Sequence, residues 1–116
     1  IHYDFVTTLD GVIEKMDNSN SEFIVPEKLV QLYTNKDYGV YGNDNNELNV
    51  CFISNNDITG GNSGSPVING RGHLIGCAFD GNWEAMSGDI AFEDQLQRTI
   101  SVDVRYILFI IDEFLL

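Results

Sequence analysis

Positive charge is scarce in this chain. Its 116 residues include six Lys and Arg against 18 Asp and Glu, which gives a formal net charge of −12. Proteins that bind nucleic acid or anionic membranes rely on Lys and Arg to neutralise phosphate groups. We therefore expect neither nucleic acid nor an anionic membrane as a partner.

Long hydrophobic runs are also missing. The longest strongly apolar run covers residues 106–111 and is bracketed by Arg105 and Asp112. A membrane-spanning helix needs about 20 apolar residues, so we expect no membrane span. The chain begins without Met. It also lacks the basic segment followed by an apolar segment that a signal peptide has. We expect it to be a piece of a longer protein.

Cysteine is limited to Cys51 and Cys77, and both lie in apolar runs. Such positions favour buried thiols, although one disulfide stays open. There is no C-x-x-C spacing, and the acidic stretch at residues 43–47 lacks the alternating acids and central Gly of an EF-hand loop. The sequence predicts no metal site and no cofactor.

What is present indicates a packed, mainly β domain. The apolar fraction is 43% and the aromatic fraction 11%, so one globular domain can form a core. Strands are predicted at residues 49–54, 66–68, 73–79 and 98–104, with a turn between the middle two. In the last strand Ile100, Val102 and Val104 alternate with polar residues, which is typical of a strand with its apolar side buried. Strands that follow one another without helices between them favour an antiparallel sheet or barrel.

Two helices are expected beside these strands. Pro26 begins a short helix near residues 26–36, and the tail from residue 106 to 116 is long enough for a second one. Residues 38–49, rich in Gly, Asn and Asp, are expected to form an exposed loop. The apolar face expected for the tail helix carries Ile107, Leu108, Ile111 and Leu115.

A glycine-dense segment, DITGGNSGSPV at residues 57–67, lies between two apolar strands. A serine nucleophile needs a sharply turned backbone and two N–H groups directed at the developing oxyanion, and glycines on both sides permit this. The N–H groups of Gly61 and Ser63 would supply that oxyanion hole, as in chymotrypsin-like peptidases. The spacing does not match a hydrolase nucleophile elbow or a P-loop. A purely structural Gly/Ser turn is the alternative.

Other polar residues have competing interpretations. Both histidines, His2 and His73, are expected to be plain surface residues. Asp57, six residues before Ser63, would favour basic substrates as in trypsin-like enzymes, or be a turn residue. Asn62 stands where digestive relatives of chymotrypsin carry an Asp that pairs with a newly cut N-terminus, so we expect no such activation step.

Three blocks of sequence resemble the C-terminal part of the bacterial dipeptidyl-peptidase 7/11 family of serine exopeptidases. They are DITGGNSGSPV, LIGCAFDGNWEAMSGD and QRTISVDVRYILFIIDEF, and the upstream TTLDGVIEK and EFIVPEKL also fit. The resemblance implies the second barrel of a chymotrypsin-like double β-barrel with its C-terminal helix. The family's catalytic His and Asp, its first barrel and its helical domain would lie outside this chain. We therefore expect one fragment, residues 1–116, with an entry segment at 1–48, strands at 49–104 and the helix at 105–116.

The resemblance also assigns roles to individual residues. Ser63 matches the nucleophile, Gly61 matches the oxyanion hole, and Asp80 matches an acid that holds the substrate's free α-amino group. Gly81 matches the position that tunes the pocket for the penultimate residue, where an Arg favours acidic side chains. With Gly at this position, the dipeptidyl-peptidase 7 type and a hydrophobic preference are expected. Thr59 and Phe79 are counted as further substrate-binding candidates.

These observations predict a fragment of a serine dipeptidyl peptidase that acts on oligopeptides and is inactive alone. The resemblance also implies a periplasmic or cell-surface location. Apolar surface left uncovered in a fragment could lead to a homodimer. A chymotrypsin-like endopeptidase and a non-enzymatic β-domain are the alternatives.

Overall fold

The computed structural model describes residues 5–82 and 98–116. The chain packs as two compact units. The first contains residues 1–6 and 51–104, and the second contains residues 7–50 and 105–116. The expected three-segment division (1–48, 49–104, 105–116) stays a prediction. No helix in the described ranges is long and apolar enough to cross a bilayer.

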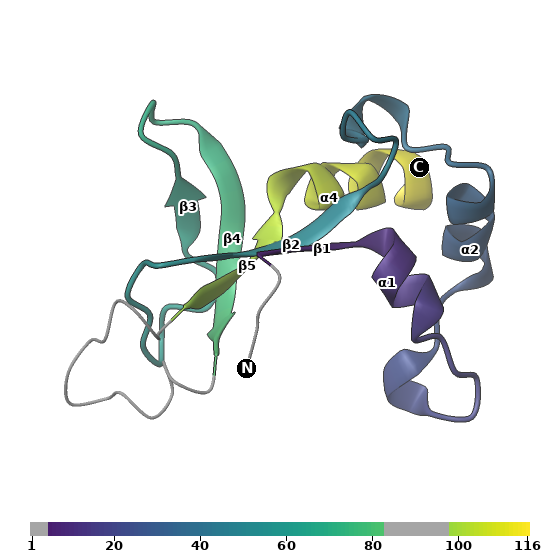
Figure 1. Cartoon of the computed structure of the whole chain (residues 1–116), viewed down its shortest axis with the longest axis horizontal. Coiled ribbons are helices and arrows are strands. Elements are labelled where there is room, and N and C mark those ends of the chain that lie inside the picture. The colour runs from purple at the N-terminus through teal and green to yellow at the C-terminus, as the bar shows by residue number, and fades with distance from the viewer. Residues whose placement is uncertain (1–4, 83–97) are drawn as a thin grey trace. The chain divides into compact units, whose positions relative to one another are not determined.

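Five strands form one sheet in the order β1-β2-β5-β4-β3. They are β1 (Val6–Thr8), β2 (Asn49–Ser54), β3 (Pro66–Ile68), β4 (Leu74–Gly81) and β5 (Thr99–Asp103). The pairs β2–β5, β4–β5 and β3–β4 are antiparallel, and the hairpin of β3 and β4 is easily followed in Figure 1. The mainly β, antiparallel fold expected from the sequence is confirmed, and all four predicted strands are present within two residues of their expected ends.

The buried face of β5 is the reverse of the sequence expectation. Thr99, Ser101 and Asp103 are buried, whereas Ile100 and Val102 are only half-buried. The ring of Phe52, which pairs with Ser101, reaches across β5 to β4, where a Cβ on Gly76 would lie 2.7 Å from its Cε1 atom. This ring covers the polar side of β5, and only glycine leaves room for it at position 76.

The two cysteines flank the same residue of β5. Cys51 of β2 and Cys77 of β4 both pair with Val102, from opposite sides. Two strand spacings of about 4.8 Å separate them, more than a disulfide can span. Both are half-buried, and neither is part of a disulfide.

The core of the second unit is formed by helices and the ends of loops. The helices are α1 (Leu9–Glu14), α2 (Glu27–Thr34) and α4 (Val104–Phe109), with short 3-10 turns at η1 (Ser21–Phe23) and η2 (Gly39–Tyr41). The helix expected near residues 26–36 is confirmed as α2, with Pro26 at its N-cap. The fully buried or nearly buried core residues are Leu9, Leu29, Tyr38, Leu48 and Phe109.

The segment at residues 38–49 is not a wholly exposed loop as the sequence predicted. Tyr38 and Leu48, near its two ends, are 2% and 0% exposed, and the Tyr38 ring meets the Phe109 ring edge-on at 6.0 Å. Only the middle of this segment is polar and exposed, while the apolar residues near its two ends pack into the core.

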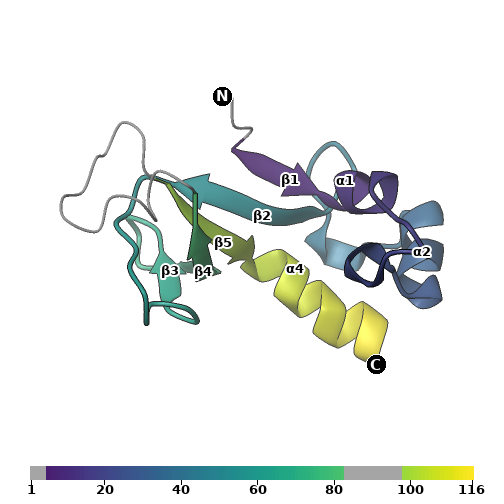
Figure 2. The same cartoon turned by 90° about the horizontal axis from the view of Figure 1, so that it is seen from below.

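The C-terminal helix forms as expected but buries a different face. Beyond α4 the chain continues as a π-helix, η3 (Ile110–Leu115), visible in Figure 2 as one ribbon running to the C-terminus. Phe109 is fully buried, with Tyr106, Ile110 and Phe114 packed against the same core. The predicted residues Leu108, Ile111 and Leu115 are exposed. The buried positions follow ordinary helical spacing, as do the predicted ones, because apolar residues lie on both sides of this helix. Spacing alone therefore does not identify the buried side.

Candidate functional site: the serine loop and its pocket

The glycine-dense segment folds into two consecutive tight turns. The Asn62 N–H donates to the Thr59 carbonyl (3.2 Å), and the Ser65 N–H donates to the Asn62 carbonyl (3.0 Å). Gly61 and Gly64 have φ values of +96° and +93°, which side chains rarely permit. These turns place Ser63 on an exposed loop just before β3.

The loop is fixed to strand β4 by backbone and side-chain bonds. The Gly64 N–H donates to the Ala78 carbonyl (2.7 Å), and the Ala78 N–H donates to the Ser65 carbonyl (2.9 Å). The Ser63 hydroxyl donates to the Phe79 carbonyl at 3.2 Å. The loop therefore has a defined position on β4 while the Ser63 side chain stays accessible to solvent.

Two backbone N–H groups at this loop matter for the chemistry of Ser63. In the described parts of the chain, neither the Gly61 N–H nor the Ser63 N–H has a hydrogen-bond partner. Free N–H groups next to an exposed hydroxyl can bind a developing oxyanion, because they lose no existing bond when the charge forms.

Asp80 and Gly81 lie at the end of β4, just beyond an irregularity. The register against β5 shifts between Ala78 and Asp80, which leaves Phe79 as the extra residue of a bulge. The Phe79 side chain is 43% exposed, and Asp80 is exposed as well. One carboxylate oxygen of Asp80 accepts from the Gly81 N–H (2.8 Å). The bulge turns the Phe79 carbonyl toward Ser63, so the serine loop and the end of β4 are neighbours.

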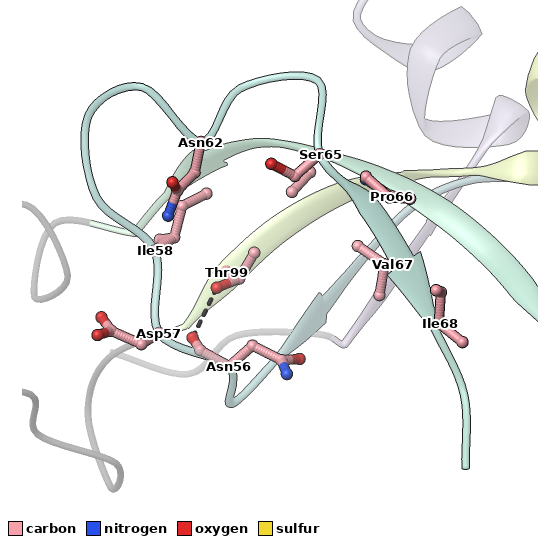
Figure 3. A pocket seen from close by; sticks show the side chains of 10 residues that line it. Asn56, Asp57, Ile58, Asn62, Ser65, Pro66, Val67, Ile68 and Thr99 are labelled. Carbon is pink, nitrogen blue, oxygen red and sulfur yellow. Dashed lines mark hydrogen bonds between the residues drawn. The ribbon is translucent and has the colours of Figure 1, made fainter. Parts of the chain in front are cut away.

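A pocket of about 310 Å³ lies between the serine loop, β3 and the segment that follows β2. Figure 3 shows the side chains that line it. Its residues are Asn56, Asp57, Ile58, Asn62, Ser65, Pro66, Val67, Ile68, Ala78 and Thr99. Ile58 and Ala78 are buried and pack with Val67, so the pocket has an apolar floor beneath a polar rim.

In the described part of the chain, none of the predicted site residues lines this pocket, although Asn62 and Ser65 on either side of Ser63 do. The predicted residues that do not line it are Ser63, Gly61, Thr59, Phe79, Asp80 and Gly81. Gly81 pairs with Thr99 across β4 and β5. Paired residues project to the same face of a sheet, so a side chain at position 81 would point to the face on which Thr99 lines the pocket. Asp57 lines the same pocket, and Thr59 lies on the exposed loop between it and Ser63. Gly81 itself is buried.

The described histidine, His73, lies apart from Ser63. His73 is exposed in the turn of the β3–β4 hairpin, where its backbone N–H donates to the Asn69 side-chain oxygen (3.0 Å). Ser63 precedes the other end of the same hairpin. His2 falls outside the described residues.

Sequence reasoning missed Thr99 and Asn56. The buried Thr99 hydroxyl donates to the Asn56 carbonyl at 2.6 Å, across a separation of 43 residues. No local pattern marks such a pair. The single available signal was the place of Thr99 at the start of a predicted strand.

Comparison with known proteins gives a consistent result. Residues 1–115 match the peptidase S46 family. The chain is 62% identical to the Dipeptidyl-peptidase 7 of Phocaeicola vulgatus and 52% identical to the Asp/Glu-specific dipeptidyl-peptidase of Flavobacterium psychrophilum. These alignments cover 97% and 98% of the chain but 16% of each relative.

A solved structure shares the fold as well. The crystal structure of Porphyromonas endodontalis DPP11 in complex with the dipeptide Arg-Glu matches with a TM-score of 0.95 and 49% identity. The match covers 98% of this chain and 16% of that one. The fold, the serine-loop sequence and the near-complete family match agree: the chain belongs to the peptidase S46 family.

Proposed function

We propose that this chain supplies the nucleophile and part of the substrate site of a serine dipeptidyl peptidase. The observation that carries the proposal is the exposed Ser63 hydroxyl beside the N–H groups of Gly61 and Ser63, which have no hydrogen-bond partner among the described residues. Relatives named as dipeptidyl-peptidases support the class of reaction. The chain spans 16% of their length, so the activity belongs to a full-length enzyme that carries this sequence.

The proposed reaction proceeds in two steps at Ser63. Its oxygen attacks the carbonyl carbon of the penultimate residue of the substrate, and its proton passes to a histidine expected outside this chain. The N–H groups of Gly61 and Ser63 bind the oxyanion, and the peptide amine leaves with the transferred proton. Water then releases the dipeptide from the acyl-enzyme and restores the serine.

Asp80 is proposed to hold the free α-amino group of the substrate. Its exposed carboxylate lies at the end of β4, next to the bulge whose carbonyl contacts Ser63. A charge-assisted bond from an ammonium to this carboxylate would orient the scissile bond. Thr59 and Phe79 would contribute to the same surface.

A hydrophobic penultimate residue is the proposed preference. The pocket floor of Ile58, Ala78 and Val67 is apolar, and Gly81 brings no charge to this face. The higher identity to the Dipeptidyl-peptidase 7 relative than to the Asp/Glu-specific one supports this type. Asp57 on the rim favours a second candidate, a preference for Lys or Arg.

The proposed location is periplasmic or at the cell surface, and fractionation of cells that produce the full-length protein would test it. A homodimer of the chain stays a prediction that sedimentation would test. The exposed apolar side of the C-terminal helix, at Leu108, Ile111 and Leu115, supports self-association.

Blocking the substrate's amino terminus tests the exopeptidase activity. The full-length enzyme should cleave a peptide with a free α-amino group, and acetylation of that group should reduce kcat/KM by at least about 100-fold. Asp80→Asn should weaken this discrimination, since the ion pair is then absent from both reactions. Equal cleavage of free and acetylated peptides would indicate an endopeptidase instead.

A further inference from the structure

One buried hydroxyl holds the wall of the pocket. Thr99 is 3% exposed, and its hydroxyl donates to the Asn56 carbonyl at 2.6 Å. Figure 3 shows Thr99 among the lining side chains with this bond drawn toward Asn56. Within residues 5–82 and 98–116, no other hydrogen bond joins residues 55–58 to the rest of the chain.

The held segment has no regular structure of its own. Strand β2 ends at Ser54, and residues 55–58 continue without helix or strand pairing. They nevertheless supply Asn56, Asp57 and Ile58 to the pocket. Their position therefore depends on the Thr99 bond and on the burial of the Ile58 side chain.

Thr99 also contacts the opposite side of the site. Its backbone pairs with Gly81 in the β4–β5 ladder, and with Ser54 in the β2–β5 ladder. A single residue thus joins the wall at Asn56–Ile58 to the strand end that carries Gly81. A change at Thr99 would alter the distance between these two sides without touching the serine loop.

We propose that Thr99 is a positioning residue that sets the width of the pocket for the penultimate side chain of the substrate. This inference rests on the proposed dipeptidyl peptidase function. The Thr99 hydroxyl donates its proton to the Asn56 carbonyl and therefore does not donate to a substrate. Thr99 affects substrates by holding residues 56–58 in place. Long apolar side chains, which reach that wall, depend on it more than short ones.

The test compares Thr99→Val with Thr99→Ser in the full-length enzyme carrying this sequence. Val keeps the shape and removes the hydroxyl, whereas Ser keeps the hydroxyl and removes the methyl group. Thr34→Val is the matched control, because the exposed Thr34 hydroxyl also donates to a carbonyl, that of Val30 at 2.9 Å, in helix α2. Active sites are counted with a fluorophosphonate, so that loss of folded protein does not affect the kinetic constants.

We expect Thr99→Val to raise KM roughly tenfold for a dipeptidyl substrate with penultimate Leu, with kcat within about twofold, because the Asn56 carbonyl has lost the donor that holds the wall in place. For penultimate Ala the rise should be less than about threefold. Thr99→Ser should keep the preference for Leu over Ala that the unsubstituted enzyme has, and Thr34→Val should not change this preference. Should Thr99→Val yield no folded enzyme, Thr99→Ala takes its place, because it also lacks the hydroxyl and adds no bulk.

Three outcomes would overturn the inference. They are an unchanged preference in the variant that lacks the hydroxyl, an equal loss for Leu and Ala substrates, or a Ser variant that behaves like the Val variant. Failure of the proposed function looks different: the unsubstituted enzyme would then not react with the fluorophosphonate, or Ser63→Ala would retain its activity.

Discussion

Gly81 is the residue at which a single side chain should change the substrate preference. An Arg there would project to the face that carries Thr99 and the pocket, where it would occupy space and add a positive charge. Exclusion of large apolar side chains and pairing with Asp or Glu are each worth about 1–3 kcal/mol. Gly81→Arg should therefore shift the ratio of Glu over Leu cleavage by roughly 100-fold or more.

Profiling with penultimate Leu, Glu and Lys measures this shift. Gly70→Arg is the control, since Gly70 lies in the exposed hairpin turn and a Cβ there meets nothing within 4 Å. An unsubstituted enzyme that favours Lys would support the role of Asp57 and contradict the hydrophobic pocket. No gain on Glu in the Gly81 variant would contradict the placement of position 81.

The roles of single residues also differ in how well they can be predicted from the sequence. The free donors at Gly61 and Ser63 follow from a local pattern, because glycines on both sides of the serine permit the turns that the structure shows. Thr99 and Asn56 meet only after the sheet has formed, and their separation of 43 residues hides the contact. Local chemistry was therefore predictable, whereas the pocket wall was not.

The C-terminal helix gives a direct test of packing at the level of an element. Phe109 is fully buried, while its neighbour Leu108 is 45% exposed. Phe109→Ala should lower the free energy of unfolding by about 3–5 kcal/mol, because it leaves a cavity among core residues. Leu108→Ala should cost less than about 1 kcal/mol. Urea unfolding of both variants measures the difference, and similar losses would contradict the observed face.

Strand β5 and the tail helix show why the spacing of apolar residues in the sequence does not identify which face of an element is buried. The pattern in β5 correctly predicts a strand, but it is symmetric with respect to the two faces of the sheet. The long side chain of Phe52 covers the polar face, and that contact comes from another strand. The tail helix has apolar residues on both sides, and packing against the core of the second unit selects the side with Phe109, Ile110 and Phe114. Both errors arise from tertiary packing rather than from a wrong choice of element.

The stability of the molecule should depend on alkaline pH through Tyr38. Burial of its ring, with Asp10 and Glu47 nearby, raises the pKa of the Tyr38 hydroxyl to about 12. The folded state then keeps this proton to a higher pH than the unfolded chain does. The resulting stabilisation is complete below about pH 10 and is lost as the pH rises to about 12.

Urea unfolding between pH 8 and pH 12 should show a loss of roughly 1–3 kcal/mol from this group. Tyr38→Phe should reduce the loss and leave stability at pH 7 unchanged or higher, since the buried hydroxyl has no hydrogen-bond partner among the described residues. Tyr41→Phe measures the contribution of a second tyrosine, since the bond from its exposed hydroxyl to Asp112 at 2.9 Å also raises the pKa of Tyr41. An unchanged alkaline slope in Tyr38→Phe would contradict this assignment.

For the whole molecule, the central claim is that Ser63 is the nucleophile of a dipeptidyl peptidase completed by residues outside this chain. The most direct measurement is fluorophosphonate labelling of the full-length enzyme, with the modified residue located by mass spectrometry and turnover followed in parallel. We predict rapid labelling at Ser63 alone, very slow labelling of the 116-residue chain, and loss of both labelling and turnover in Ser63→Ala. Ser21→Ala, an exposed serine in the second unit, should retain both. Labelling at another residue, or activity in Ser63→Ala within tenfold of the unsubstituted enzyme, would contradict the claim.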